Sequence, residues 1–148
     1  MHSTQTGRID GILVRPKRTQ TPVVVQHWDV LSTQDHGKSS SKRAITLIQK
    51  EHFEVISALA GHTVTWEKTR RNLLVSNINL LSLIGHRFRV GEVLLEGTCI
   101  VDPCNNMELA MGEGTYAAMM GHGGIGARII EGGRIHIGDT VQWLIPSP

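Results

Sequence analysis

The chain has 148 residues, of which 40% are hydrophobic and 19% are charged, a balance typical of one folded domain, here residues 1–148, and not of a disordered chain. A net charge of +2 argues against nucleic-acid binding, and two cysteines in a chain of this length argue against a disulfide scaffold. The sequence contains no apolar run of membrane-spanning length and no signal peptide, so we expect a cytoplasmic protein that binds neither nucleic acid nor membrane.

The first third of the chain alternates predicted strands with polar loops. Short apolar runs predict strands at Gly7–Val14, Val23–Trp28 and Lys42–Gln49. The polar segment Arg15–Thr21 is predicted to connect the first two strands as a hairpin. Asp29–Ser41 is rich in Ser, Asp and Gly and is predicted to be a loop.

The middle of the chain contains one clear helical pattern. Lys50–Gly61 has apolar residues at helical spacing and ends on a glycine. A short strand is expected at Thr63–Glu67, and Thr69–Val75 passes from charged to apolar residues. Asn79–Ile84 fits one helical turn, and His86–Leu95 begins with the alternation of a strand.

The stretch Val90–Leu109 contains both cysteines. Four apolar residues in it suit a buried strand, and these are Val93, Leu94, Leu95 and Ile100. Asp102-Pro103 is predicted to turn the chain into a helix, because Asp caps helices and Pro suits their first position. Cys104 would then lie in the first helical turn, where the helix dipole favours a thiolate and the Asp102 carboxylate opposes it. The alternative is that Cys104 is a small buried hydrophobe.

The last third is rich in glycine. Met107–Met120 is predicted to form short helices and Gly121–Gly126 a glycine-rich loop. Ala127–Ile130 and Arg134–Ile137 are predicted to pair as a hairpin, and Thr140–Ile145 is the last strand. Many short strands with glycine turns predict a mostly β protein, a closed or nearly closed β-barrel with a few short helices.

Two patterns could bind a phosphate or another anion. Gly121–Gly126 matches G-x-G-x-x-G, but a helix is predicted before it and a strand after it, the reverse of a dinucleotide site. Arg70-Arg71-Asn72, with Arg43 and Arg128, could form an anion pocket, and the alternative is a set of solvated surface arginines. If Arg70 and Arg71 lie on a strand, only one of them can face the cysteine.

The histidines and cysteines give weaker signals. Cys99, Cys104, His86 and His122 could in principle bind zinc, but Cys-x4-Cys without a second pair is not a zinc signature. His122, in the glycine loop, is the best partner for a Cys–His pair. The remaining histidines that flank the predicted helix, His52 and His62, are expected at the surface.

Four blocks in order resemble one family: Arg70-Arg71-Asn72, Leu81–Thr98, Asp102-Pro103-Cys104 and the glycine-rich close. The chain resembles a small stand-alone MOSC domain, the module named for the C-terminus of molybdenum-cofactor sulfurases. The resemblance implies a MOSC-type β-barrel. It implies that Cys104 is the catalytic or metal-binding thiol. It further implies a set of cofactor-binding residues: Arg70, Arg71, Asn72, Gly124, Gly126 and Arg128. To these we add His122, because it lies in the glycine loop.

The resemblance also implies the chemistry. In the family the thiol is proposed to carry sulfur as a persulfide or to coordinate the metal of the molybdenum cofactor, molybdopterin. The alternatives are a molybdenum-dependent reductase of N-hydroxylated compounds and a non-enzymatic binding module with an inert cysteine, so whether the chain is an enzyme stays open.

The resemblance also leaves some features open. The chain has no pyridoxal-phosphate domain, so a separate sulfur donor of the cysteine desulfurase type and a small anionic ligand are the expected partners, with homo-oligomerisation left open. The segment Ser32–Gly37 departs from the family's Gly-Leu-x-Gly-Asp motif, which leaves the role of that loop open.

Overall fold

The computed structural model describes residues 6–15, 21–31, 41–103, 108–109 and 111–144, and strands make up most of its regular structure. The strands are β1 Thr6–Val14, β2 Val23–Val25, β3 His27–Val30, β4 Ile45–Gln49, β5 Leu73–Ser76, β6 Arg87–Val90, β7 Val93–Ile100, β8 Ile125–Glu131, β9 Gly133–His136 and β10 Thr140–Trp143. The helices are α1 His52–Ala60 and α3 Thr115–Met119, with 3-10 turns η2 Trp66–Thr69 and η3 Leu80–Leu83.

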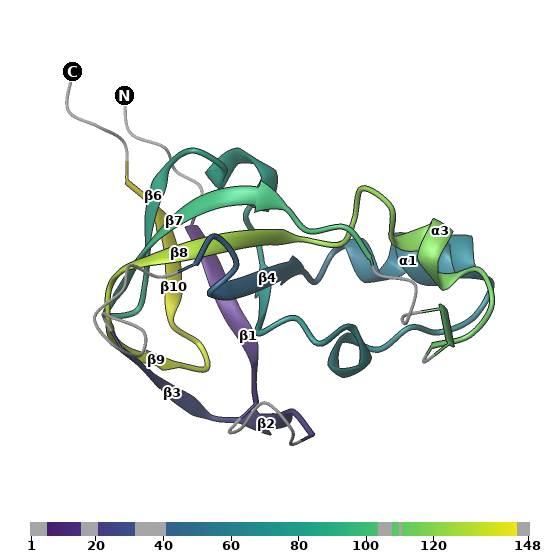
Figure 1. Cartoon of the computed structure of the whole chain (residues 1–148), viewed down its shortest axis with the longest axis horizontal. Coiled ribbons are helices and arrows are strands. Elements are labelled where there is room, and N and C mark those ends of the chain that lie inside the picture. The colour runs from purple at the N-terminus through teal and green to yellow at the C-terminus, as the bar shows by residue number, and fades with distance from the viewer. Residues whose placement is uncertain (1–5, 16–20, 32–40, 104–107, 110, 145–148) are drawn as a thin grey trace.

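The strands close into a barrel (Figure 1). Their order around it is β10-β6-β7-β8-β4-β5-β1, and β10 pairs back with β1. Strand β2 extends β1 at one edge, whereas β3 and β9 form a separate two-stranded sheet. Neighbours in the barrel are antiparallel except β4 and β5, and parallel neighbours need a long crossover. That crossover contains α1 and η2, which lie beside the barrel with α3.

Two apolar clusters form the core. The larger fills the barrel, and fully buried members such as Ile9, Leu47 and Phe88 each contribute about 1.5–3 kcal/mol by burial. The second lies between α1, α3 and the barrel, and centres on Ile56, Trp66 and other buried residues. Ile56 is the buried residue of α1, as the helical spacing of Lys50–Gly61 requires.

The mostly β barrel predicted from the sequence is confirmed, and so is the first hairpin, in which Ile12 pairs with Val25. The predicted helix is confirmed over His52–Ala60, and Gly61 ends it in the left-handed conformation with φ +79°. The predicted strand Val23–Trp28 is broken at Gln26 into β2 and β3, which belong to different sheets.

Three local predictions were wrong. Thr63–Glu67 is not a strand: the 3-10 turn η2 begins at Trp66, whose buried indole donates to the Arg71 carbonyl. Ile100 is 48% exposed, because it lies at the end of β7 where the strand leaves the barrel. The hairpin between β8 and β9 does not form: β8 pairs with β7 and, over Ile125–Ala127, with β4, whereas β9 pairs with β3.

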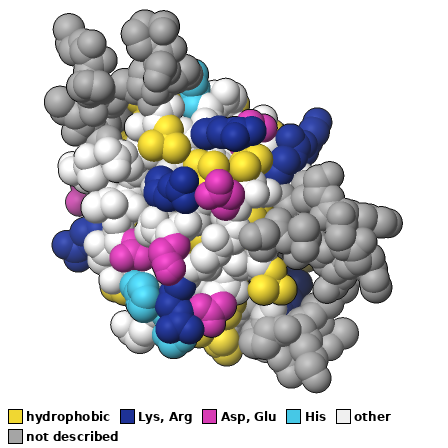
Figure 2. Space-filling model, turned by 90° about the vertical axis from the view of Figure 1, so that its left-hand side faces the viewer, with side chains coloured by type: hydrophobic (Ala, Val, Ile, Leu, Met, Phe, Trp, Pro, Cys, Tyr) yellow, Lys and Arg dark blue, Asp and Glu magenta, His cyan; other side chains and the backbone are white. Residues whose placement is uncertain are grey.

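The outer surface carries mixed charge. Figure 2 shows Lys and Arg side chains interspersed with Asp and Glu on the face at the left of Figure 1. Ion pairs account for part of this mixture, among them Arg89 with Glu131 on the barrel and Arg134 with Asp29 on the separate two-stranded sheet. No helix in the described part of the chain is both long and apolar enough to cross a lipid bilayer.

Candidate functional site

The turn Thr69–Asn72 sends its two arginines into different surroundings. Arg70 adopts the left-handed conformation with φ +61° and closes η2, with its N–H directed to the Glu67 carbonyl. The buried Thr69 hydroxyl donates to the Trp66 carbonyl (2.6 Å) and accepts from the Arg71 N–H (3.3 Å). As a result, Arg70 is exposed and Arg71 is buried, with 7% of its surface accessible. Neither residue lies on a strand, because β5 begins at Leu73.

The Arg71 guanidinium contacts two backbone segments. Its Nε donates to the Gly123 carbonyl at 2.7 Å, and its Nη2 donates to the Asp102 carbonyl at 3.3 Å. Asp102 lies two residues before Cys104, and Gly123 lies in the glycine loop. This arginine therefore joins the chain that leads into Cys104 to the loop before β8.

The Asn72 side chain joins three parts of the barrel wall. Its Oδ1 accepts from the Thr46 N–H (2.9 Å) and its Nδ2 donates to the Leu13 carbonyl (3.0 Å). The Thr46 hydroxyl contacts the Asn72 Oδ1 at 3.1 Å and the Asn72 N–H at 3.1 Å. These contacts give Asn72 a structural role at one wall of the hollow described next.

A hollow of about 200 Å³ lies beside this turn, lined by Leu13, Val14, Arg15, Pro22, Arg70 and Asn72. A second hollow of about 340 Å³ adjoins it, since the two share Leu13, Pro22 and Arg70, and Lys68 lines this second one together with Glu67. Cationic side chains over apolar walls suit a ligand with an anionic end and an apolar body.

The glycine loop allows close approaches between backbones. Gly124 has φ +94°, and a Cβ there would lie 2.0 Å from the Leu47 carbonyl oxygen. Gly126 lies opposite Cys99 in the sheet, and a Cβ on it would lie 3.3 Å from the Cys99 Sγ. Helix α3 precedes the loop and β8 follows it, so the loop lacks the strand-then-helix order of a dinucleotide site.

His122 contacts another histidine. Its ring lies edge to face against His52 with the centroids 4.9 Å apart, and its Nδ1 is buried without a hydrogen bond among the described residues. Burial and the neighbouring His122 lower the pKa of His52, and the Glu51 carboxylate opposes them. His52 and His62 were both expected at the surface, whereas the structure makes both half-buried.

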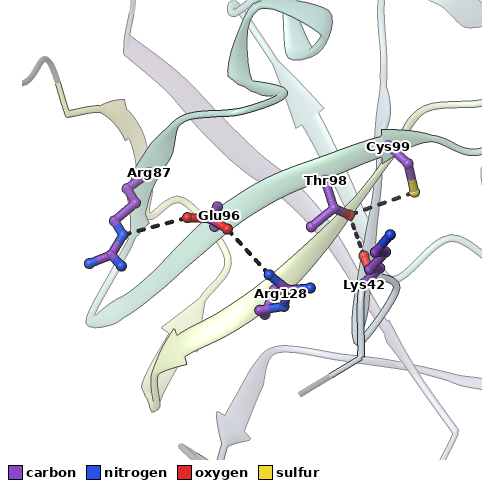
Figure 3. A network of polar contacts seen from close by, with 6 residues as sticks. All are labelled: Lys42, Arg87, Glu96, Thr98, Cys99 and Arg128. Atoms are coloured by element: carbon purple, nitrogen blue, oxygen red, sulfur yellow. Dashed lines mark hydrogen bonds and ion pairs between the residues drawn. The ribbon is translucent and has the colours of Figure 1, made fainter. Parts of the chain in front are cut away.

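Cys99 is a free thiol in a setting that favours its anion (Figure 3). Burial alone would raise the pKa of Cys99, but hydrogen bonds from Thr98, Arg43 and the Gly126 N–H, with the Arg43 charge, lower it overall. The Thr98 hydroxyl lies between the sulfur, 3.6 Å away, and the Lys42 carbonyl, and its single proton is donated to one of these acceptors at a time. The sequence indicates Cys99 only as a possible zinc ligand, because the closeness of Cys99 to Arg43 follows from the register of the sheet.

Arg128 lies on the outer face of the barrel. Its Nη1 is 3.4 Å from Glu96 Oε1, and Arg87 Nε approaches the other oxygen of the same carboxylate at 3.7 Å. Figure 3 shows the Arg128 side chain directed towards Glu96. Arg128 lines neither of the two hollows beside Arg70.

Two predicted features lie outside the described residues, namely Cys104 and the segment Ser32–Gly37. Among the residues that the structure does describe, no group of three His, Cys, Asp or Glu side chains could hold a metal ion. His86, one of the zinc candidates, packs its ring against Trp143 with centroids 5.2 Å apart.

Comparisons with known proteins identify the same kind of domain. The sequence profile of the MOSC domain matches residues 33–142. The fold is similar to the crystal structure of the YuaD protein from Bacillus subtilis, with a TM-score of 0.76, 17% identity and coverage of 95% of this chain and 97% of that one.

Two structures of YiiM proteins are also similar. YiiM from Geobacillus stearothermophilus gives a TM-score of 0.73 at 17% identity, with 94% of this chain and 75% of that one covered. YiiM from Escherichia coli gives 0.69 at 17% identity, with 95% and 71% covered. Among curated proteins, none has a sequence that matches the chain significantly.

Proposed function

The chain belongs to the MOSC domain family, and from this premise we propose that it binds the molybdenum cofactor or carries sulfur on Cys104 as a persulfide. One observation supports the proposal: the turn Arg70–Asn72 lines a cationic hollow and also contacts the segment that leads into Cys104. Arg70 and Asn72 line the hollow that also contains Arg15, and Arg71 bonds to the Asp102 carbonyl, two residues before Cys104. The same turn of the chain thus contributes two side chains to the hollow and one hydrogen bond to the segment before Cys104.

The groups around this hollow fit an anionic pterin cofactor. The planar guanidinium groups of Arg15 and Arg70 bind phosphate or carboxylate oxygens in pairs, and Leu13, Val14 and Pro22 offer an apolar wall to a ring. Cys104 would supply a soft thiolate ligand to the metal. When bound, the cofactor supplies a redox-active metal centre, and the residues of this chain hold and orient it.

Sulfur transfer needs no cofactor, only a donor persulfide. The Cys104 thiolate attacks the terminal sulfur of a donor R–S–SH, a new S–S bond forms on Cys104, and the donor leaves as its thiolate R–S⁻. The donor class is a protein such as a cysteine desulfurase. A positive charge beside the thiol would favour both the attacking thiolate and the persulfide anion that results.

Intact-mass spectrometry tests the sulfur-carrier form. The wild-type chain, incubated with a sulfur-charged cysteine desulfurase, should gain the mass of one sulfur atom, and Cys104→Ala should gain none. Cys99→Ser is the matched control and should load like the wild type. Equal loading of Cys104→Ala and wild type, or no loading of either, would remove this form of the proposal.

Metal and pterin analysis tests the cofactor form. The chain purified from a host that makes molybdenum cofactor should contain molybdenum and pterin in equal amounts, and Arg70→Ala should lower both. A cofactor-loaded chain that reduces an N-hydroxylated compound would indicate the reductase alternative. A wild-type chain with neither metal nor pterin, and with a Cys104 that a thiol reagent labels only after denaturation, would indicate a binding module with an inert cysteine.

A further inference from the structure

Arg71 is a buried cation, and two hydrogen bonds hold its backbone in place. Its N–H donates to the Thr69 hydroxyl (3.3 Å) and its carbonyl accepts from the Trp66 indole (3.0 Å). Because Thr69 is fully buried and Trp66 nearly so, the Arg71 backbone has little freedom to move. The long side chain therefore starts from a defined point and leads into the protein.

The guanidinium then contacts two chain segments that are far apart in sequence. The Gly123 carbonyl accepts from Nε at 2.7 Å and the Asp102 carbonyl accepts from Nη2 at 3.3 Å. The same two segments touch directly, because the Val101 N–H donates to the Gly124 carbonyl at 2.9 Å. A Cβ on Gly123 would lie 2.3 Å from the Val101 carbonyl oxygen, so only glycine permits this approach without a shift.

We infer that Arg71 is a positioning residue for Cys104, which rests on the proposed role of Cys104 as the working thiol. Arg71 fixes the backbone at Asp102 against the glycine loop, and the buried Pro103 continues that fixed backbone towards Cys104. A planar guanidinium can donate in two directions at once, whereas a lysine ammonium on a flexible stem cannot hold two carbonyls in one fixed geometry. The resemblance implies that Arg71 binds the cofactor, whereas its Nε and Nη2 atoms donate to backbone carbonyls, one of them at Asp102, two residues before the thiol.

The test reads the thiol of Cys104 directly. In a Cys99→Ser background, iodoacetamide labelling over a pH series gives the midpoint pH of the Cys104 thiol, in folded and in urea-denatured protein. The folded and denatured midpoints should differ, and Arg71→Lys and Arg71→Met should move the folded midpoint towards the denatured one. Sulfur loading from a charged cysteine desulfurase should slow by about tenfold or more in both variants. Arg89→Met, which removes an arginine paired with Glu131 on the outer surface, is the control and should change neither quantity.

The outcomes separate three cases. If the variants unfold more easily but keep the wild-type midpoint and loading rate, Arg71 is only structural and the inference is wrong. If the folded and denatured wild-type midpoints coincide, the fold sets no special environment for Arg71 to maintain, which also overturns it. If the wild type takes no sulfur but the midpoint moves as expected, the proposed function fails while the positioning role holds. Arg71→Lys keeps the buried charge, so it provides the answer if Arg71→Met does not fold.

Discussion

The imidazole ring of His52 meets that of His122 edge to face, with the ring centroids 4.9 Å apart. Burial and the neighbouring His122 lower the pKa of His52, so the unfolded chain binds a proton at His52 more tightly than the folded chain does. The free energy of unfolding should therefore fall as the pH drops through about 6.5, the ordinary value for histidine, and this term should vanish well above it.

The measurement is urea unfolding between about pH 5 and pH 8 for the wild type and His52→Gln. A single proton can change the free energy of unfolding by at most about 1.4 kcal/mol per pH unit. Because the His52 ring is half-exposed, we expect a slope well below that limit. The free energy of unfolding of His52→Gln should fall less steeply on the acid side than that of the wild type. An unchanged slope in His52→Gln would contradict the prediction.

Gly124→Ala should destabilise the fold by about 2–4 kcal/mol, because it combines a strained backbone with a steric clash. The residue has φ +94°, and its Cβ would lie 2.0 Å from the Leu47 carbonyl oxygen and 2.9 Å from the carbonyl carbon. Gly121→Ala is the matched control, since Gly121 has φ +82° with open space around it and should cost only about 1–2 kcal/mol. Thermal and urea unfolding give the loss of stability in each variant. Equal losses in Gly124→Ala and Gly121→Ala would contradict the expected clash with Leu47.

Asn72→Ala should lower the free energy of unfolding by about 2–3 kcal/mol. The truncation leaves the Thr46 N–H and the Leu13 carbonyl without their partner in the barrel wall. Asn72→Asp keeps the acceptor for Thr46 but places a carboxylate against the Leu13 carbonyl, so it should destabilise as well. The contribution of the Thr46 hydroxyl follows from a double-mutant cycle with Thr46→Val, which should give a coupling of about 1 kcal/mol. A fully stable Asn72→Ala would indicate that Asn72 serves only the hollow.

Local patterns in the sequence were sufficient for much of the fold. The apolar spacing of Lys50–Gly61 and its terminal glycine predicted α1, and apolar runs predicted most strands of the barrel. Pairing between distant strands was not predictable in the same way, because it depends on which edges are already occupied. The predicted β8–β9 hairpin shows this: β9 is adjacent in sequence but pairs with β3, more than a hundred residues earlier.

The site was only partly predictable for the same reason. The motif Arg70–Asn72 indicated a functional segment. It did not predict that the Arg70 backbone adopts the left-handed conformation, which sends the two guanidinium groups in different directions. The Arg71 contact with Gly123 spans 52 residues, and no local pattern encodes it. The setting of Cys99 depends on the register that places it opposite Gly126, and a β-bulge between Gly97 and Cys99 shifts that register.

The Cys99 thiol should react as an anion at a lower pH than an ordinary cysteine. In a Cys104→Ser background, its iodoacetamide labelling midpoint should lie below the value of about 8.5 for an unperturbed thiol. Although burial raises the pKa of Cys99, the hydrogen bonds from Thr98 and Arg43 and the Arg43 charge lower it further than burial raises it. The same protein in urea supplies the reference midpoint.

Two arginine variants test which contact lowers the pKa of Cys99. Arg43→Met removes both a hydrogen bond and a positive charge from the sulfur, so its midpoint should rise towards the denatured value. Arg87→Met removes a surface arginine that pairs with Glu96 on the same face of the barrel, and it should leave the midpoint unchanged. If both variants shift the labelling midpoint of Cys99 equally, the summed positive charge of this face of the barrel lowers the pKa of Cys99. If only Arg43→Met does so, the cause is the local contact, because a charge screened by water acts over a short range.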